Sequence, residues 1–271
     1  MRFWLSCLPN MVLALLLKLI EELLRLIDCL VNPRVRSRVR VIMAHIDSTP
    51  ISIDAIKTWI FDLDNTIYPA QSRLFDQVRH RMTDYIQHHF SLERTAAKAM
   101  QRDLFLRHRT TMKGLMLEHG TDPHHFMDYV HDIDLTMLGY DKELDDGIGA
   151  LSGRKVIFTN GSADHAANIL DAYGIRHHFD FTYDIFSADF QPKPEPRTYA
   201  DFMNKANIDP ASAIMVEDMA VNLKPAYDMG VTTLWLDHPD EDVPSEGRMD
   251  DISHIHYIAD DLKHFLSYTN R

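Results

Sequence analysis

The chain has 271 residues, of which 45% are hydrophobic and 25% are charged, as in an ordinary globular protein. Two cysteines are too few for a disulfide framework or a four-ligand zinc site, and the net charge of −12 argues against nucleic acid as the main partner. Charged residues interrupt the longest apolar stretches, so a conventional membrane span is not expected.

The first 42 residues differ from the rest in charge, since they carry a net charge of +4 and leave −16 for the remainder. Residues 12–30 combine an apolar face with charges at helical spacing, and residues 33–41 alternate arginine with valine. One interpretation is an amphipathic helix and basic patch that contact an anionic membrane surface. The interpretation that we favour is that translation starts at Met43, so we expect residues 1–42 to lie outside the fold.

A secretory signal fits this segment less well than either interpretation. Lys18, Glu21 and Glu22 interrupt its apolar stretch, and no clear cleavage site follows. Because there is no clear export signal and the two cysteines are unpaired, we expect a cytoplasmic location.

Beyond residue 43, short β-branched and aromatic runs alternate with helical patterns. The runs predict buried strands over residues 58–63, 155–159, 181–186, 213–217 and 232–236. Helical patterns cover 165–173, 198–206 and 221–229, and the first and last of these end next to Gly174 and Gly230. This alternation predicts an α/β fold in which a parallel sheet has helices on both faces.

Residues 74–149 break the alternation, because they contain helical patterns and no convincing strand. The patterns cover 74–90, 92–119 and 123–130. Ser91 is expected to cap the second helix, and Asp122 followed by Pro123 the third. The predicted organisation is therefore an α/β core made of residues 43–73 and 150–271, with a helical insertion over 74–149.

Polar side chains follow the predicted strands where the strands end. They are Asp62 and Asp64 after the first strand, Thr159 and Asn160 after the second, Lys193 after the third, and Asp218 after the fourth. In an open parallel sheet, ligands bind at the carboxyl ends of the strands, so we expect one site. Clustered carboxylates need a cation, and oxygen donors suit Mg²⁺. An amine, a hydroxyl and backbone N–H groups would hold phosphate, while one aspartate attacks phosphorus and its neighbour protonates the leaving oxygen.

Taken singly, several of these residues also have plain structural interpretations. Thr159 could cap the next helix, Lys193 could be a surface lysine, and Glu217 could support the site or point away from it. The two acids at the end of a hydrophobic strand are different, because burying them without a role would be costly.

The sequence FDLDNT at residues 61–66 resembles motif one of the haloacid dehalogenase superfamily. Thr159, Lys193 and the pair Glu217-Asp218 match its motifs two, three and four in order. The resemblance covers about residues 57–240 and implies a Rossmann-like core. It implies that Asp62 is the nucleophile, and that Asp64 is the general acid and base and also ligates Mg²⁺ through its backbone carbonyl. It further implies that Asp218 completes the metal site, and that Thr159, Lys193 and the Asn160 backbone bind phosphate.

Further residues resemble the pyrimidine 5′-nucleotidase branch of that superfamily. They are DNTIYP at 64–69, GL at 114–115, VHD at 130–132, FTNG at 158–161, HA at 165–166 and NL at 222–223. The resemblance implies an all-α cap of the C1 type after the first strand, which closes over the site, and hydrolysis of nucleoside 5′-monophosphates. His131 and Asp132 would contact the nucleoside. Met219 departs from the small hydroxyl residue that is usual in the branch.

Several alternatives remain open at the level of the sequence. Within the same superfamily they are a phosphatase for a sugar phosphate or phosphoglycolate, a phosphomutase and a dehalogenase, of which Asp64 disfavours the last. From another class comes a membrane-surface binding protein with an inactive core, which would use the first helix.

Overall fold

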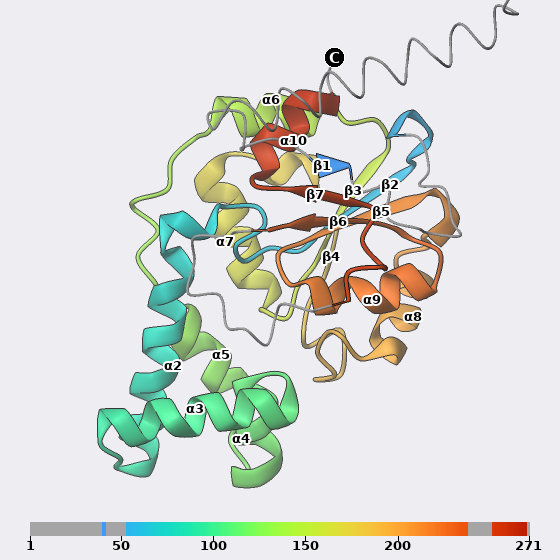
Figure 1. The fold of residues 1–271 in the computed structure, drawn as a ribbon. Coiled ribbons are helices and arrows are strands. Elements are labelled where there is room, and N and C mark those ends of the chain that lie inside the picture. The colour runs from blue at the N-terminus through green and yellow to red at the C-terminus, as the bar shows by residue number, and fades with distance from the viewer. Residues whose placement is uncertain (1–39, 42–52, 238–250, 270–271) are drawn as a thin grey trace, which may run out of the picture. The chain divides into compact units, whose positions relative to one another are not determined.

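A seven-stranded sheet organises the chain in the computed structural model, which describes residues 40–41, 53–237 and 251–269. The strands lie in the order β1-β7-β6-β5-β2-β3-β4 (Figure 1). Their bounds are β1 Arg40–Val41, β2 Thr58–Phe61, β3 Arg154–Phe158, β4 Phe181–Tyr183, β5 Ala213–Glu217, β6 Thr232–Leu236 and β7 Tyr257–Ala259. All neighbouring pairs are parallel except β1 with β7. The predicted α/β class with a parallel sheet is confirmed.

Residues along the central strands alternate between the two faces of the sheet. In β2, Trp59 and Phe61 join one apolar cluster and Ile60 joins the other. In β3, Ile157 faces the first cluster while Val156 and Phe158 face the second. Because both faces are buried, these strands read in the sequence as continuous apolar runs.

Helices cover both faces of the sheet. The first cluster contains residues of α6 (Lys142–Ala150), α7 (Ala163–Tyr173) and α10 (Leu262–Thr269), and the second contains residues of α8 (Pro196–Lys205) and α9 (Ala220–Asp228). Figure 1 shows the two groups on opposite sides of the strands. The helices also return the chain to the same edge of the sheet, so that every parallel strand ends on the side of the site.

Replacement of Phe202 by Ala is expected to lower the free energy of unfolding by about 3–5 kcal/mol. The Phe202 ring is buried in α8, and its centroid lies 4.4 Å from that of Phe158 and 5.3 Å from that of Tyr183. Urea unfolding measures the loss. The matched control is Leu117→Ala, because Leu117 is 60% exposed and its truncation should change the free energy by no more than about 0.5 kcal/mol.

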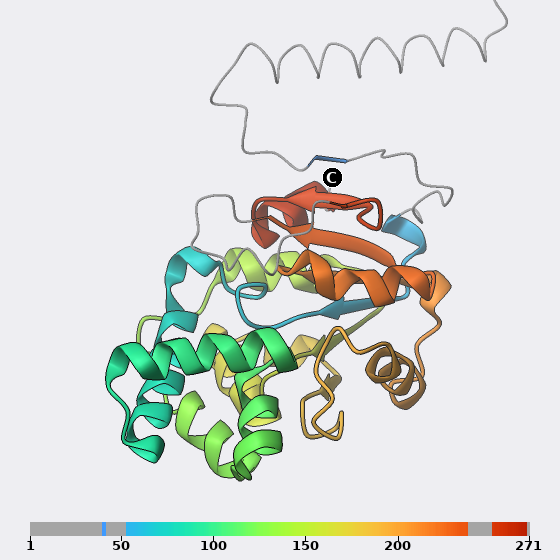
Figure 2. The ribbon, with the colours of Figure 1, turned by 60° about the horizontal axis from the view of Figure 1, so that its bottom comes forward.

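Four helices form an insertion between β2 and β3. They are α2 (Leu74–Phe90), α3 (Arg94–His108), α4 (Thr111–His119) and α5 (Pro123–His131), and we call them the helical insertion. The range predicted for it, 74–149, also includes α6, whose Leu144 and Ile148 pack in the first cluster on the sheet instead. The buried side chains of the four insertion helices make a separate apolar cluster that includes Val78, Leu104 and Phe126. Ile185, from the segment after β4, also belongs to that cluster. The insertion is therefore a bundle with a core of its own, beside the sheet (Figure 2).

The predicted helix over residues 92–119 is wrong, because the structure has two helices there. Arg109 ends α3 in the left-handed conformation with φ of 71°, and the Thr110 side chain accepts a hydrogen bond from the Lys113 N–H and caps α4. Ser91 does not cap the next helix, since it ends α2 with φ of 52°. The predicted cap at Asp122 is confirmed, because its side chain accepts a hydrogen bond from the His124 N–H.

Two residues that were expected to lie outside the fold, because they precede residue 43, belong to the sheet. Arg40 and Val41 form β1 and pair with Ile258 and Tyr257 of β7. Alternation of a charged and an apolar residue suits a sheet edge with one solvated face, which explains why two residues of this basic segment join the sheet. The predicted helix over 12–30 lies outside the described residues. Among the helices of the described ranges, none is both long enough and apolar enough to cross a bilayer.

Candidate active site

Asp62 directly follows β2 at the carboxyl edge of the sheet. Its backbone N–H donates to the Val216 carbonyl of β5 at 2.9 Å, which holds the residue in register with the neighbouring strand. Its side chain is 9% exposed, and Oδ1 accepts a hydrogen bond from the Lys193 ammonium at 2.6 Å. The carboxylate is therefore placed by the sheet and bound by a buried cation.

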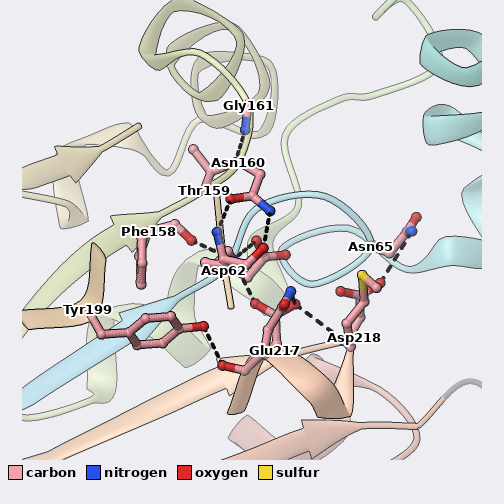
Figure 3. A network of polar contacts seen from close by, with 12 residues as sticks. Asp62, Asn65, Phe158, Thr159, Asn160, Gly161, Tyr199, Glu217 and Asp218 are labelled. Atoms are coloured by element: carbon pink, nitrogen blue, oxygen red, sulfur yellow. Dashed lines mark hydrogen bonds and ion pairs between the residues drawn. The ribbon is translucent and has the colours of Figure 1, made fainter. Parts of the chain in front are cut away.

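The Lys193 ammonium joins residues from three strand ends. Its Nζ donates to Asp62 Oδ1, to Glu217 Oε2 at 2.7 Å and to the Phe158 carbonyl at 2.9 Å. Figure 3 shows these three acceptors converging. Burial opposes the charged form, but Asp62 and Glu217 outweigh it and raise the pKa of Lys193 above its usual value. All three ammonium hydrogens are thus used within the protein.

Three carboxylates gather around this lysine. The ligand oxygens of Asp62, Glu217 and Asp218 all lie within 4.8 Å of one another. Burial and then the charge of Glu217 raise the pKa of Asp62 to about 7, and the same causes raise the pKa of Asp218 well above its usual value. One ammonium does not balance three carboxylates, so the cluster favours a further cation. Because every metal-ligand atom in the cluster is a carboxylate oxygen, the residues fit Mg²⁺.

Glu217, whose orientation the sequence left open, is part of this cluster. Its side chain is 1% exposed, and its Oε1 accepts a hydrogen bond from Asn222 Nδ2 at 3.0 Å. The Asp218 carbonyl accepts from Trp235 Nε1 at 2.8 Å, which ties the end of β5 to β6. The feature of the sequence that could have indicated a role for Glu217 in the site is its position as the last residue of an apolar strand.

The Asp64 carboxylate has partners that differ from those of the three clustered acids. Its Oδ1 accepts hydrogen bonds from the Tyr68 hydroxyl at 2.5 Å and from His165 Nε2 at 2.9 Å. Burial opposes ionisation, but the charge and hydrogen bond of His165, together with Tyr68, hold the pKa of Asp64 below its usual value. The structure therefore gives the two aspartates of the DLD sequence different surroundings.

The loop after β3 brings Thr159 and Asn160 next to these acids. Thr159 is buried, and its Oγ1 accepts from the Gly161 N–H at 2.9 Å. Asn160 Oδ1 accepts from the Lys193 N–H at 2.8 Å, so its side chain anchors the lysine loop. A Cβ built on Gly161 would lie 3.2 Å from Thr159 Oγ1 and 3.7 Å from Asp64 Oδ2, so a side chain there would crowd the loop.

The two residues predicted to contact a nucleoside differ in position. The His131 ring stacks on the His165 ring with centroids 4.0 Å apart, and its Nδ1 lies 2.9 Å from Ser162 Oγ. Burial and the nearby His165 lower the pKa of His131 to about 3. Asp132 instead pairs with Arg81 at 2.8 Å, and its side chain is 79% exposed. The structure brings His131 to the site residues and pairs Asp132 with Arg81 of α2.

A second group of possible metal ligands lies at the opposite edge of the sheet. It contains Asp145 of α6 and His177 and His178, which precede β4. Hydrogen bonds from Tyr140 and His178 already occupy the Asp145 carboxylate, and His177 is largely exposed. We assign it no function.

Comparison with known proteins gives a consistent result. The sequence model of a hydrolase family, the haloacid dehalogenase-like hydrolases, matches residues 56–230. A HAD phosphatase from Thermococcus onnurineus is 16% identical, and the match covers 79% of this chain and 97% of that chain with a TM-score of 0.53. The putative HAD-hydrolase YfnB from Bacillus subtilis, bound to magnesium, is 15% identical, with 80% and 99% covered and a TM-score of 0.52. An L-2-haloacid dehalogenase is 13% identical, with 79% and 99% covered and a TM-score of 0.50. At these identities the structural matches establish the fold.

Proposed function

The chain belongs to the haloacid dehalogenase-like hydrolases, and from this premise we propose that it hydrolyses phosphomonoesters through an aspartyl-phosphate on Asp62. The observation that carries the proposal is the buried Asp62 carboxylate, held by Lys193 within a cluster of three acids. Asp64, two residues further on, is held separately by Tyr68 and His165. These separate surroundings support attack by one carboxylate and proton transfer by the other.

The proposed reaction has two steps. An Asp62 oxygen attacks phosphorus, the bond from phosphorus to the alcohol oxygen breaks, and Asp64 gives its proton to that oxygen. Asp64 then takes a proton from a water molecule whose oxygen attacks the aspartyl-phosphate, which releases phosphate and restores both carboxyl groups. A proton from water thus replaces the one that Asp64 gave to the alcohol.

The proposed metal site uses the side chains of Asp62 and Asp218 and the backbone carbonyl of Asp64. Glu217 lies within reach as a fourth residue, although its Oε2 is occupied by Lys193. When bound, Mg²⁺ would offset the charge shared by these carboxylates and an incoming phosphoryl group. The Thr159 hydroxyl, the Asn160 backbone N–H and the Lys193 ammonium would hold phosphoryl oxygens.

For the substrate we propose a pyrimidine-type nucleoside 5′-monophosphate. The support is the set of residues shared with that branch, and within the structure the placement of His131 beside the loop after β3. In this proposal the helical insertion serves as a cap that closes over the site during phosphoryl transfer, and the enzyme works in the cytoplasm.

Dehalogenation is the second candidate, since one of the matching structures is a dehalogenase. The acid cluster favours the phosphatase, because three clustered carboxylates beside one ammonium call for a cation. A halide leaving group also needs no proton, which would leave Asp64 without a role in bond cleavage.

A phosphatase screen tests this proposal. With Mg²⁺, the chain is expected to release phosphate from nucleoside 5′-monophosphates and more slowly from sugar phosphates and phosphoglycolate. Excess EDTA should lower the rate at least about 100-fold, because a bound cation contributes several kcal/mol to such transition states. Added Mg²⁺ should restore the rate. Turnover of 2-chloropropionate with no release of phosphate from any ester would contradict the proposal.

A further inference from the structure

Two stacked histidines connect the helical insertion to Asp64. His131 is the last residue of α5, and His165 lies in the first turn of α7. Their ring planes are inclined by only 7°, with centroids 4.0 Å apart, and His165 is 1% exposed. A contact this close between an insertion helix and a core helix fixes one ring relative to the other.

Ser162, the residue that caps α7, holds both histidines. Its Oγ accepts from the His165 N–H at 3.3 Å and lies 2.9 Å from His131 Nδ1. The hydrogen bond from the His165 N–H fixes the start of α7, and the contact with Nδ1 ties His131 to the same hydroxyl. The pair is therefore held by stacking and by a shared polar partner.

His165 presents its Nε2 to Asp64 Oδ1 at 2.9 Å. Oδ1 accepts this hydrogen bond both when Asp64 is ionised and when it carries its proton on Oδ2 as the general acid, so Nε2 must carry the hydrogen in this contact. Tyr68 donates to the same oxygen, and a Cβ on Gly161 would lie 3.7 Å from the other oxygen, Oδ2. Two donors thus hold Oδ1 and turn Oδ2 toward the loop that contains Thr159.

We propose that His165 is a positioning residue for Asp64, and that His131 makes the orientation of Asp64 depend on where the helical insertion lies. This inference rests on the proposed phosphatase function. When the insertion sits as it does in the structure, the His131 ring backs the His165 ring and Oδ2 faces the phosphoryl loop. When α5 moves away, His165 loses that support, so proton transfer is efficient only with the insertion in place.

The choice of leaving group separates positioning from a general loss of structure. An aliphatic ester must receive a proton as its alcohol leaves, whereas p-nitrophenolate leaves readily without one. The ratio kcat/KM reports steps up to transfer of phosphate to Asp62, before the water attacks. A misplaced Asp64 should therefore lower kcat/KM for an aliphatic ester far more than for p-nitrophenyl phosphate.

The test compares four variants with both substrates, and the aliphatic ester is a sugar phosphate, so that a contact of His131 with a nucleoside cannot produce the difference. His165→Phe keeps the ring but removes the donor, and should lower kcat/KM for that ester by about 100-fold, within the range of a general acid. For p-nitrophenyl phosphate the loss should stay below about fivefold. His165→Gln, whose amide can donate, should recover at least tenfold of the loss. His131→Ala should lower kcat/KM for the aliphatic ester about tenfold more than for p-nitrophenyl phosphate. His131→Phe, which keeps the stacking, should restore kcat/KM for the aliphatic ester.

His124→Ala is the matched control. His124 also lies in α5 and stacks on a core residue, with its ring centroid 4.4 Å from that of Phe186. Loss of this contact should change kcat/KM for the two substrates equally. Because His165 is buried, circular dichroism and Tm are measured for every variant, and His131 alone tests the inference if His165→Phe does not fold.

Three outcomes would contradict the inference. The His165 assignment is overturned if its variants lose the same factor on both substrates, or lose nothing. The link to the insertion is overturned if His131→Ala matches the wild type or the His124→Ala control. A wild-type chain that turns over no phosphate ester at all would overturn the proposed function itself, and this inference with it.

Discussion

Replacement of Asp62 by Asn is expected to lower kcat by about 10⁴-fold or more while the protein still folds. The amide cannot form the acyl phosphate, so the proposed pathway loses its first step. Asn keeps the size of the side chain and an oxygen that can accept the hydrogen bond now made by Lys193 Nζ at 2.6 Å. Phosphate release under saturating substrate measures the loss.

The same substitution is expected to raise Tm when metal is removed with EDTA. Burial and Glu217 raise the pKa of Asp62 from 3.8 to about 7, so between these pH values the native chain binds a proton that the unfolded chain has released. The free energy of unfolding of the wild type then falls as the pH rises through this window. The amide that replaces the carboxyl group carries no such charge, so the gain in Tm should grow from pH 4 to pH 7.

Asp128→Asn serves as the control for this prediction, because Asp128 is exposed on α5 and outside the acid cluster. It should leave both kcat and the pH dependence of Tm unchanged. Turnover of Asp62→Asn within tenfold of the wild type would rule out the aspartyl-phosphate pathway.

Lys193→Met is expected to lower kcat by about 10²–10³-fold, as when a fixed donor is lost from an active site. It should also destabilise the protein, by up to about 3–5 kcal/mol, because removal of one partner leaves buried charges unpaired. Here Asp62 and Glu217 lose their counter-charge and the Phe158 carbonyl loses its donor. Urea unfolding at pH 7.5 with EDTA measures the second effect.

The two substitutions should therefore both lower kcat, but with opposite effects on stability. Lys98→Met, at an exposed position in α3, is the control and should be neutral in both measurements. A Lys193→Met protein as stable as the wild type would show that the ammonium does not balance the cluster.

Much of the fold follows from patterns within single segments. The run at 232–236 predicts β6 with its observed bounds, because a strand buried on both faces has to be apolar throughout. β7 was not predicted, since three residues after a histidine-rich loop carry no periodicity, and its pairing with β6 supplies the stabilisation. The end of α3 at Arg109 is not predicted for a related reason. The helical pattern of the sequence continues on both sides of Arg109, and nothing in it indicates the left-handed φ of 71°.

In the site, too, some features follow from the sequence and others depend on tertiary packing. Topology alone brings Asp62, Thr159 and Asp218 to one edge, because parallel strands end there. The sequence does not show which side chains hold the Asp64 carboxylate, since residues 64–69 form a turn after the strand and alternation no longer fixes the direction of the side chain. Its partner His165 lies 101 residues further along the chain, and only the packing of α7 against the sheet brings them together.

The Lys193 ammonium has no hydrogen to spare, and this constrains any anion that it recognises. An incoming phosphoryl oxygen gains this lysine only by exchange with an acceptor that the lysine already has. The Phe158 carbonyl is the uncharged member of the three, so its replacement by an anionic oxygen costs the least electrostatic energy. A weakly charged or poorly fitting anion does not displace this carbonyl. The buried ammonium therefore discriminates among ligands at the binding step, before any bond is broken.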